Sequence, residues 1–265
     1  MFITRLSLPT AFIISAFDKG GKLYAPSRKL RSLTLPDLEP ISYGQGWLWN
    51  IDTIDNGKCE AHTLSVGCAR PTDLDQCAIA AYYQSKGQLL PKVKLAESRL
   101  SKAMVDALGT KWIETCFDGA IKSVNSQHLV EHTQVIWLYN CLKAWGMHEF
   151  AKDRYGTLVN NRKKFDPSLS FDEAIDKIGR GGWGFMPGLA PEEGKDYFDD
   201  DLKGVPKENR DLYKEAYDFM KLWCTPKDTA KKEATTQMAK ESPPKEWETS
   251  YEMKPFPDFP DQKYP

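Results

Sequence analysis

The stretch that decides the fold is residues 127–145, which read QHLVEHTQVIWLYNCLKAW. Apolar side chains occur nearly all round the helical wheel of this segment. A helix without a polar face is buried centrally or covered by a partner. Gly146 follows directly and is a typical C-terminal cap. We therefore predict a buried helix from about Gln127 to Trp145, with the rest of the core built around it.

Amphipathic segments on both sides of this helix indicate a helical core. Residues 91–108 carry an apolar stripe at helical spacing that opens with Pro91. Comparable stripes recur in residues 112–124, 150–159 and 206–223. Ser170-Phe-Asp-Glu173 has the capping-box pattern that opens a short helix. Since strands and helices do not alternate, a Rossmann-type sheet is not expected. The prediction is a mainly α protein with a core of five to six helices.

The first ninety residues have a different pattern. Ala11–Phe17 is strand-like, and Trp47–Ile54 leads through Asn56-Gly57 into Cys59–Val66. An Asn-Gly pair supplies the positive φ values of a tight hairpin. We therefore expect a β-hairpin in a β/loop region of residues 1–90, followed by a helical domain over residues 91–224.

Residues 225–265 form a third region, rich in Pro, Lys and Glu, which we predict to be an extended tail. Such a composition cannot bury much apolar surface by itself. Aromatic residues nevertheless recur along it: Trp247, Tyr251, Phe256, Phe259 and Tyr264. A polar arm with spaced aromatics is typical of a segment that lies along another protein. The alternative is a disordered tail.

One constellation in the sequence has catalytic potential. His128, Glu131 and His132 have the H-x-x-E-H form, which resembles the helix of the inverted zinc-peptidase family. The resemblance implies that the two histidines share a zinc ion and that Glu131 acts as general base. It also implies a distal glutamate, for which Glu208 and Glu215 are the candidates. The resemblance covers five residues, and the alternative is that these are core or surface histidines.

The same segment has a second resemblance. His132-Thr-Gln-Val-Ile-Trp137, followed by Asn140, is similar to the His-Tyr-Thr-Gln-Val-Val-Trp signature of the CAP (cysteine-rich secretory) proteins. One residue is missing, so the ligand histidine of that family becomes Glu131 or falls out of register. The family continues with a strand, whereas the periodicity here predicts a helix.

Two further segments have the composition of ligand-binding loops. Gly179–Gly188 is rich in glycine and could cradle a phosphate, but it has no Lys-Ser/Thr ending. We favour a loop whose Trp183 and Phe185 pack on the core or on a neighbour. Asp199-Asp-Asp201 could bind a divalent cation, but it lacks a second acidic motif, and we predict a solvated acidic turn.

Charge and hydropathy limit the function classes. The chain has 36 Lys and Arg against 37 Asp and Glu, which argues against a general nucleic-acid binder. No run of eighteen apolar residues occurs, so we expect no membrane-spanning helix, while peripheral membrane association stays open. Residues 1–36 are basic with one acid, as in organellar targeting segments or in a strand followed by a basic loop. The spacing of Cys59, Cys68 and Cys77 leaves their disulfide state open.

Together these features predict a non-catalytic structural or accessory subunit of a multiprotein complex, with other protein subunits as partners and no cofactor. The expected location is the mitochondrion, or otherwise the cytoplasm. The tail aromatics are the predicted partner contacts. The first alternative is a zinc-dependent hydrolase using His128, Glu131 and His132. The second is a peptide- or ligand-binding module built on the hairpin with Trp47 and Trp49.

Overall fold

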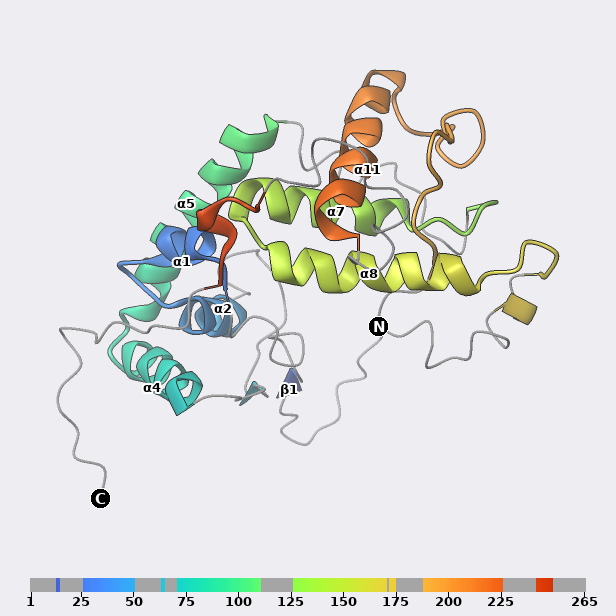
Figure 1. Cartoon of the computed structure of the whole chain (residues 1–265). Coiled ribbons are helices and arrows are strands. Elements are labelled where there is room, and N and C mark those ends of the chain that lie inside the picture. The colour runs from blue at the N-terminus through green and yellow to red at the C-terminus, as the bar shows by residue number, and fades with distance from the viewer. Residues whose placement is uncertain are drawn as a thin grey trace, which may run out of the picture. The chain divides into compact units, whose positions relative to one another are not determined.

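The structure, a computed structural model, describes residues 13–14, 26–50, 63–64, 71–110, 126–170, 172–174, 188–225 and 242–249. The chain divides into two compact units, residues 1–101 with 249–265 and residues 102–248. The described residues are mainly helical, which confirms the predicted fold class at that level (Figure 1). Among them, no helix is both long and apolar enough to cross a membrane.

The second unit is organised around α7 (His132–Trp145), α8 (His148–Lys164) and α11 (Arg210–Cys224). In Figure 1 α7 and α8 lie side by side and α11 crosses them, packing on both. Gly146 ends α7 in the left-handed conformation with φ 65°, and its amide donates to the carbonyl of Leu142 at 2.8 Å, as predicted for a C-terminal cap. The core is therefore formed where the apolar faces of three helices meet.

Helix α7 begins five residues later than predicted, because the turn before it is held in another conformation. The hydroxyl of Ser126 accepts hydrogen bonds from the amides of His128 and Val130, at 3.2 and 3.1 Å. A serine side chain that bonds nearby amides in this way competes with helix formation. Leu129 has φ 55°, which lies outside the helical region. The helix prediction is thus correct for residues 132–145 and wrong for residues 127–131.

Other predicted features of the second unit agree with the structure. The amide of Ser170 donates to the carboxylate of Glu173 at 2.8 Å and the amide of Glu173 donates to the hydroxyl of Ser170 at 3.3 Å, which are the two reciprocal bonds of a capping box. The last predicted helix consists of a 3₁₀ turn, η3 (Lys207–Asn209), followed by α11. Residues 112–124 and 179–187 lie outside the described residues, so those two predictions remain predictions.

The first unit contains α1 (Arg28–Thr34), α2 (Pro40–Trp49), α4 (Pro71–Ser85) and the first part of α5 (Leu89–Leu108). Helix α5 confirms the helix predicted over residues 91–108. The two-residue strands β1 (Ile13–Ile14) and β2 (Thr63–Leu64) pair in parallel. Helices therefore fill much of a region for which the sequence pattern predicts strands and loops.

The predicted hairpin is wrong where it can be compared, since Trp47 and Trp49 lie in α2. Pro40 stands at the start of this helix, a position that suits its fixed φ. The indole nitrogen of Trp47 donates to Glu97 of α5 at 3.1 Å. Gly46 lies so close to α5 that an added Cβ would meet a Val93 methyl at 2.7 Å. Packing on α5 thus favours helix over strand in this segment.

Helix α1 is tied to the first unit by a buried ion pair. The guanidinium of Arg31 donates twice to the carboxylate of Glu39, at 2.9 and 2.6 Å, and both side chains are at most one-tenth exposed. Ser27 caps the helix by accepting the amide of Leu30 at 2.9 Å. Basic residues from Arg28 onward are therefore part of the fold.

Candidate functional site: a histidine–aspartate network

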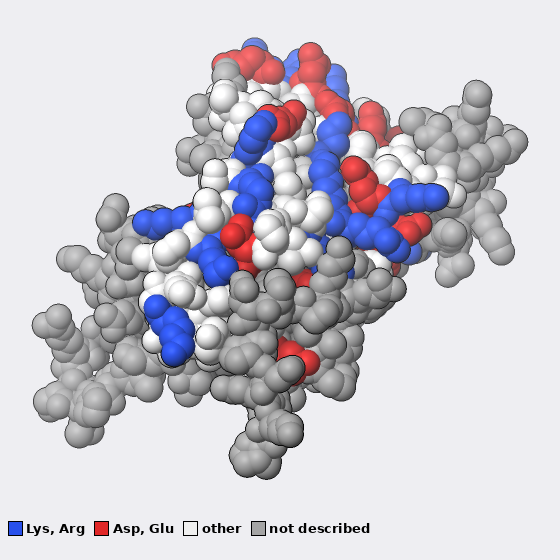
Figure 2. All heavy atoms as spheres, turned by 90° about the vertical axis from the view of Figure 1, so that its left-hand side faces the viewer, with Lys and Arg blue, Asp and Glu red and all other residues white. Residues whose placement is uncertain are grey.

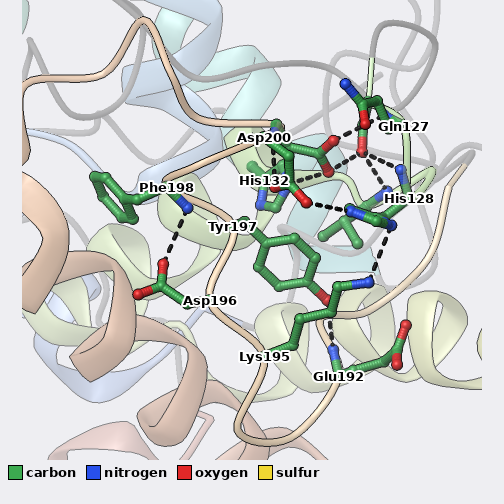
Figure 3. A network of polar contacts seen from close by, with 12 residues as sticks. Gln127, His128, His132, Glu192, Lys195, Asp196, Tyr197, Phe198 and Asp200 are labelled. Carbon is green, nitrogen blue, oxygen red and sulfur yellow. Dashed lines mark hydrogen bonds and ion pairs between the residues drawn. The ribbon is translucent and has the colours of Figure 1, made fainter.

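The two histidines of the sequence motif each contact one of two consecutive aspartates. The Nε2 atom of His128 lies 2.5 Å from Oδ2 of Asp200, and Nε2 of His132 lies 3.1 Å from Oδ2 of Asp201. His128 belongs to the turn before α7 and His132 is the first residue of α7. Both aspartates come from the loop of residues 188–205, which precedes α11, and Figure 3 shows Asp200 of this loop beside His128. The network therefore joins segments that are about seventy residues apart in the sequence.

Asp201 lies at the centre of this network and its side chain has no exposed surface. Its Oδ1 accepts the amide of Gln127 at 2.7 Å, and its Oδ2 accepts the hydroxyl of Ser126 as well as His132. Burial acts to raise the pKa of Asp201, but the hydrogen bonds from these three groups outweigh it and lower the pKa to about 2. Asp201 is therefore a buried carboxylate that stays ionised at neutral pH.

His132 has partners at both ring nitrogens. Its Nδ1 lies 2.6 Å from the hydroxyl of Tyr217 in α11, and the ring of Tyr197 meets its ring edge-on at 4.9 Å. Since the carboxylate of Asp201 can only accept, Nε2 carries the hydrogen and Nδ1 accepts from Tyr217. Burial lowers the pKa of His132, and this effect exceeds the opposing effect of Asp201. The ring is thus neutral and held in one tautomer.

His128 has the same arrangement at the edge of the network. The ammonium of Lys195 lies 3.0 Å from Nδ1, and Asp200 contacts Nε2 (Figure 3). An ammonium group only donates, so Nδ1 accepts and Nε2 carries the hydrogen that faces Asp200. The side chains of His128 and Asp200 are 26% and 29% exposed, so solvent reaches this half of the network.

Three groups of the network are close enough to hold a cation. Ligand atoms of His128, Asp200 and Asp201 lie within 4.8 Å of one another. In most metal sites the second nitrogen of a ligating histidine donates to an acceptor, whereas Nδ1 of His128 accepts from Lys195. A metal would also have to displace the hydrogen that Nε2 shares with Asp200. The donor set therefore suits a hydrogen-bonded network better than a metal centre.

The structure does not assemble the predicted helical zinc site. His128 and Glu131 precede α7, so they do not share a helix face with His132. Glu131 stands at the N-cap position, and its amide donates to the carbonyl of Leu189 at 3.1 Å. The segment that resembles the CAP signature continues as helix α7, without the strand of that family.

Neither candidate for the distal glutamate is engaged with the network. Glu215 accepts from the hydroxyl of Tyr139 at 2.5 Å and from Lys143 at 3.1 Å. Hydrogen bonding by Tyr139 lowers the pKa of Glu215. Glu208 is exposed in η3. Glu215 thus supports α7, and its contacts are those of a surface ion pair.

The prediction of a solvated acidic turn is correct for Asp199, holds in part for Asp200, whose side chain is 29% exposed, and is wrong for Asp201. The side chain of Asp199 is 91% exposed, whereas that of Asp201 is fully buried. No local pattern in the sequence distinguishes the two. What could have signalled the network is the chemical match between two histidines and two consecutive aspartates, but nothing in the sequence says that these segments meet.

One of the five predicted partner contacts lies in the described residues. Trp247 is only 8% exposed and belongs to the core of the second unit, where it contacts the rings of Trp223, Phe219 and His148. The other four residues lie beyond the described part of the chain: Tyr251, Phe256, Phe259 and Tyr264. The contacts of Trp247 are therefore within its own chain.

Comparisons with protein-family models, with curated proteins and with solved structures found no match to this chain. What the network does must then be argued from its geometry. It fixes the loop of residues 188–205 against the turn before α7, with an ionised aspartate at the centre and two oriented imidazoles around it.

Proposed function

We propose that this chain is a non-catalytic accessory subunit of a multiprotein complex. The observation that carries the proposal is that each histidine of the motif has both ring nitrogens engaged by neighbouring side chains. Asp200 and Lys195 contact His128. Asp201 and Tyr217 contact His132, which is fully buried. Groups that are hydrogen-bonded on both sides in this way hold a loop in place, which is a structural role.

The surface charge supports a protein partner. Basic and acidic side chains both occur on the face in Figure 2, in keeping with a formal net charge of −1. A surface of mixed charge does not favour binding to the polyanionic backbone of nucleic acids. Residues 250–265 carry four aromatic side chains in a Pro-rich segment, a composition typical of arms that dock on other proteins. We assign the contact with other subunits to this segment.

We further propose that the complex is mitochondrial, on the basis of the basic N-terminal composition. Because α1 begins at Arg28 and Arg31 is paired with Glu39, residues from Ser27 onward are needed by the fold. We therefore place the proposed targeting signal within residues 1–25. Import of a fluorescent protein fused to residues 1–25 tests this part of the proposal, and a cytoplasmic fusion protein would contradict it.

The zinc-dependent hydrolase has one observation in its favour, the cluster of His128, Asp200 and Asp201. This is a different ligand set from the predicted pair of histidines. The contact between Lys195 and His128 weighs against a metal site, because Nδ1 of His128 accepts from Lys195 and its Nε2 then carries a hydrogen. The second alternative, a peptide-binding module, is not supported at Trp47 and Trp49, since these residues lie in α2.

The test compares three forms of the chain expressed in its own cells by native electrophoresis. They are the full chain, the chain ending at Thr249, and the full chain with Glu131→Gln. Ending at Thr249 removes four tail aromatics but keeps Trp247 in the core. We expect the full chain and Glu131→Gln to migrate in a large complex and the shortened chain to migrate near its own mass. Unchanged migration of the shortened chain would remove residues 250–265 from the proposal.

A further inference from the structure

Residues 242–248 are seated on the second unit with a single buried side chain. Within this segment, all of which the structure describes, Trp247 is buried and the six other residues are exposed. The backbone forms a short 3₁₀ helix, η5 (Lys245–Trp247), closed by the amide of Trp247 donating to the carbonyl of Pro244 at 2.8 Å. The segment therefore has the form of a self-contained turn that presents one aromatic residue.

The surface that receives Trp247 is made by α8 and α11. Its ring centroid lies 5.2 Å from that of Trp223 with the planes at 78°, and 6.1 Å from that of Phe219 at 63°. The ring of His148 stacks on it at 5.9 Å and 30°. These are favourable geometries for aromatic pairs. We call the surface formed by His148, Phe219 and Trp223 the aromatic site.

The aromatic site is organised by contacts that do not involve residues 242–248. The Nε2 atom of His148 donates to the carbonyl of Trp223 at 2.8 Å, which fixes the imidazole against the end of α11. The ring of Phe219 meets that of Tyr139 edge-on at 5.4 Å, and the ammonium of Lys143 lies 5.0 Å from its centroid. A site that is ordered in advance binds a ligand with a smaller loss of entropy.

The seated segment returns to the end of α11 from which the chain left, because Trp247 contacts Trp223 next to the last residue of that helix. Residues 226–241 are rich in Lys, Glu, Thr and Ala and contain one proline. A flexible connection of this length gives the attached segment an effective concentration on the order of 1 mM at its binding site. A segment bound through one buried side chain at that concentration can exchange with a competing segment.

We propose that the aromatic site is a peptide-binding site for a tryptophan that follows a pair of prolines, and that residues 242–248 are its intramolecular competitor. The site takes the corresponding segment of a partner subunit when Trp247 leaves. Tryptophan is the residue most often found at the energetic centre of protein interfaces, and its departure exposes three aromatic rings to a partner. This inference rests on the proposed role as a subunit and specifies the chemistry of one contact.

The experiment uses the purified full chain with Trp247→Ala and a fluorescein-labelled peptide of residues 242–249, Ser-Pro-Pro-Lys-Glu-Trp-Glu-Thr. Fluorescence anisotropy should show binding to Trp247→Ala at least about tenfold tighter than to the unsubstituted chain, whose own segment competes. The peptide with alanine in place of tryptophan should not bind. The double variant Trp247→Ala, Trp223→Ala should also lose binding. A folded Trp247→Ala chain that ignores the peptide overturns the proposal.

A second measurement covers the case in which Trp247→Ala does not fold. The unsubstituted chain is labelled with 5-fluorotryptophan, and Trp247→Phe identifies the fluorine resonance of Trp247. Excess unlabelled peptide should move that resonance to a solvent-exposed position, and an unmoved resonance overturns the proposal. Dimers that form with rising chain concentration and vanish on adding peptide would name a second copy as the partner. Both assays use the purified chain, so their failure is independent of whether the cellular protein belongs to a complex.

Discussion

The Nε2 atom of His132 lies 3.1 Å from the Oδ2 atom of Asp201, and neither side chain has any exposed surface. A buried carboxylate is costly unless hydrogen bonds compensate for the lost water, and here three donors do so. The consequence is that one aspartate in an acidic loop connects the turn before α7, the first residue of α7 and the loop before α11.

Replacing Asp201 with asparagine should lower the free energy of unfolding by about 3 kcal/mol. Asparagine keeps the size of the side chain, but its NH₂ group faces either Gln127 or His132, each of which is a donor. Urea denaturation followed by circular dichroism measures the effect. Asp199→Asn is the matched control, because Asp199 is 91% exposed, and should change stability by less than about 0.5 kcal/mol. Equal effects of the two changes would show that Asp201 is not the centre of the network.

Stability should fall as the pH decreases below about 6.5, the ordinary pKa of histidine. The folded pKa of His132 is lowered, so the unfolded chain takes up a proton there that the folded chain does not. At pH 5.5 protonation of this residue in the unfolded chain lowers the free energy of unfolding by up to about 1.4 kcal/mol. A second loss follows between the ordinary pKa of Asp201, 3.8, and its folded value of about 2.

Denaturation at pH 7.5 and pH 5.5 tests the first of these losses. The comparison is with His132→Gln, which should show a smaller pH dependence. If both proteins lose the same stability between the two pH values, His132 does not carry the effect and its buried neutral state is refuted.

Changing Tyr217 to phenylalanine should destabilise the second unit by about 1–2 kcal/mol, because Nδ1 of His132 loses its donor while remaining buried. The nitrogen-15 spectrum of the histidine rings gives a more specific readout. We expect the Nε2–H tautomer of His132 in the unsubstituted chain and a changed Nδ1 shift in Tyr217→Phe. A charged imidazole, or the opposite tautomer, at neutral pH would contradict the assignment of donors and acceptors.

The purified chain should bind no stoichiometric zinc at neutral pH. The reason is that Lys195 donates to Nδ1 of His128, which leaves the hydrogen on the nitrogen that faces Asp200. Metal analysis after dialysis against zinc is the measurement, with His128→Ala as the control. One zinc ion per chain that disappears in His128→Ala would restore the hydrolase hypothesis, and Glu131→Gln would then be tested for loss of activity.

Periodicity predicted the helices of the core well. The stripes of residues 91–108 and 206–223 and the apolar stretch up to Trp145 correspond to α5, α11 and α7. The Gly146 cap and the Ser170–Glu173 capping box were also predictable, because caps are set by residues a few positions apart. These features depend on local sequence alone.

The errors lie where distant contacts decide the conformation. Trp47 and Trp49 alternate as in a strand, but the close approach of Gly46 to Val93 and the bond from Trp47 to Glu97 hold this segment on α5 as a helix. These partners are about fifty residues away, beyond the reach of pattern reasoning.

The site was predictable in its residues and not in its arrangement. His128 and His132 drew attention because they are four residues apart, which on a helix would give a metal pair. The amides of His128 and Val130 donate to the hydroxyl of Ser126, so His128 lies in a turn and not on the helix that carries His132. Asp200 and Asp201 looked like solvent-exposed acids because their partners lie about seventy residues earlier.

The central claim is that this chain works as a subunit, and the native size of the endogenous protein tests it most directly. The protein is extracted gently, separated by blue-native electrophoresis and identified in each band by mass spectrometry. The account predicts migration with a reproducible set of partners at a size far above the 30.1 kDa of the chain. Migration of the whole pool near 30 kDa would contradict it.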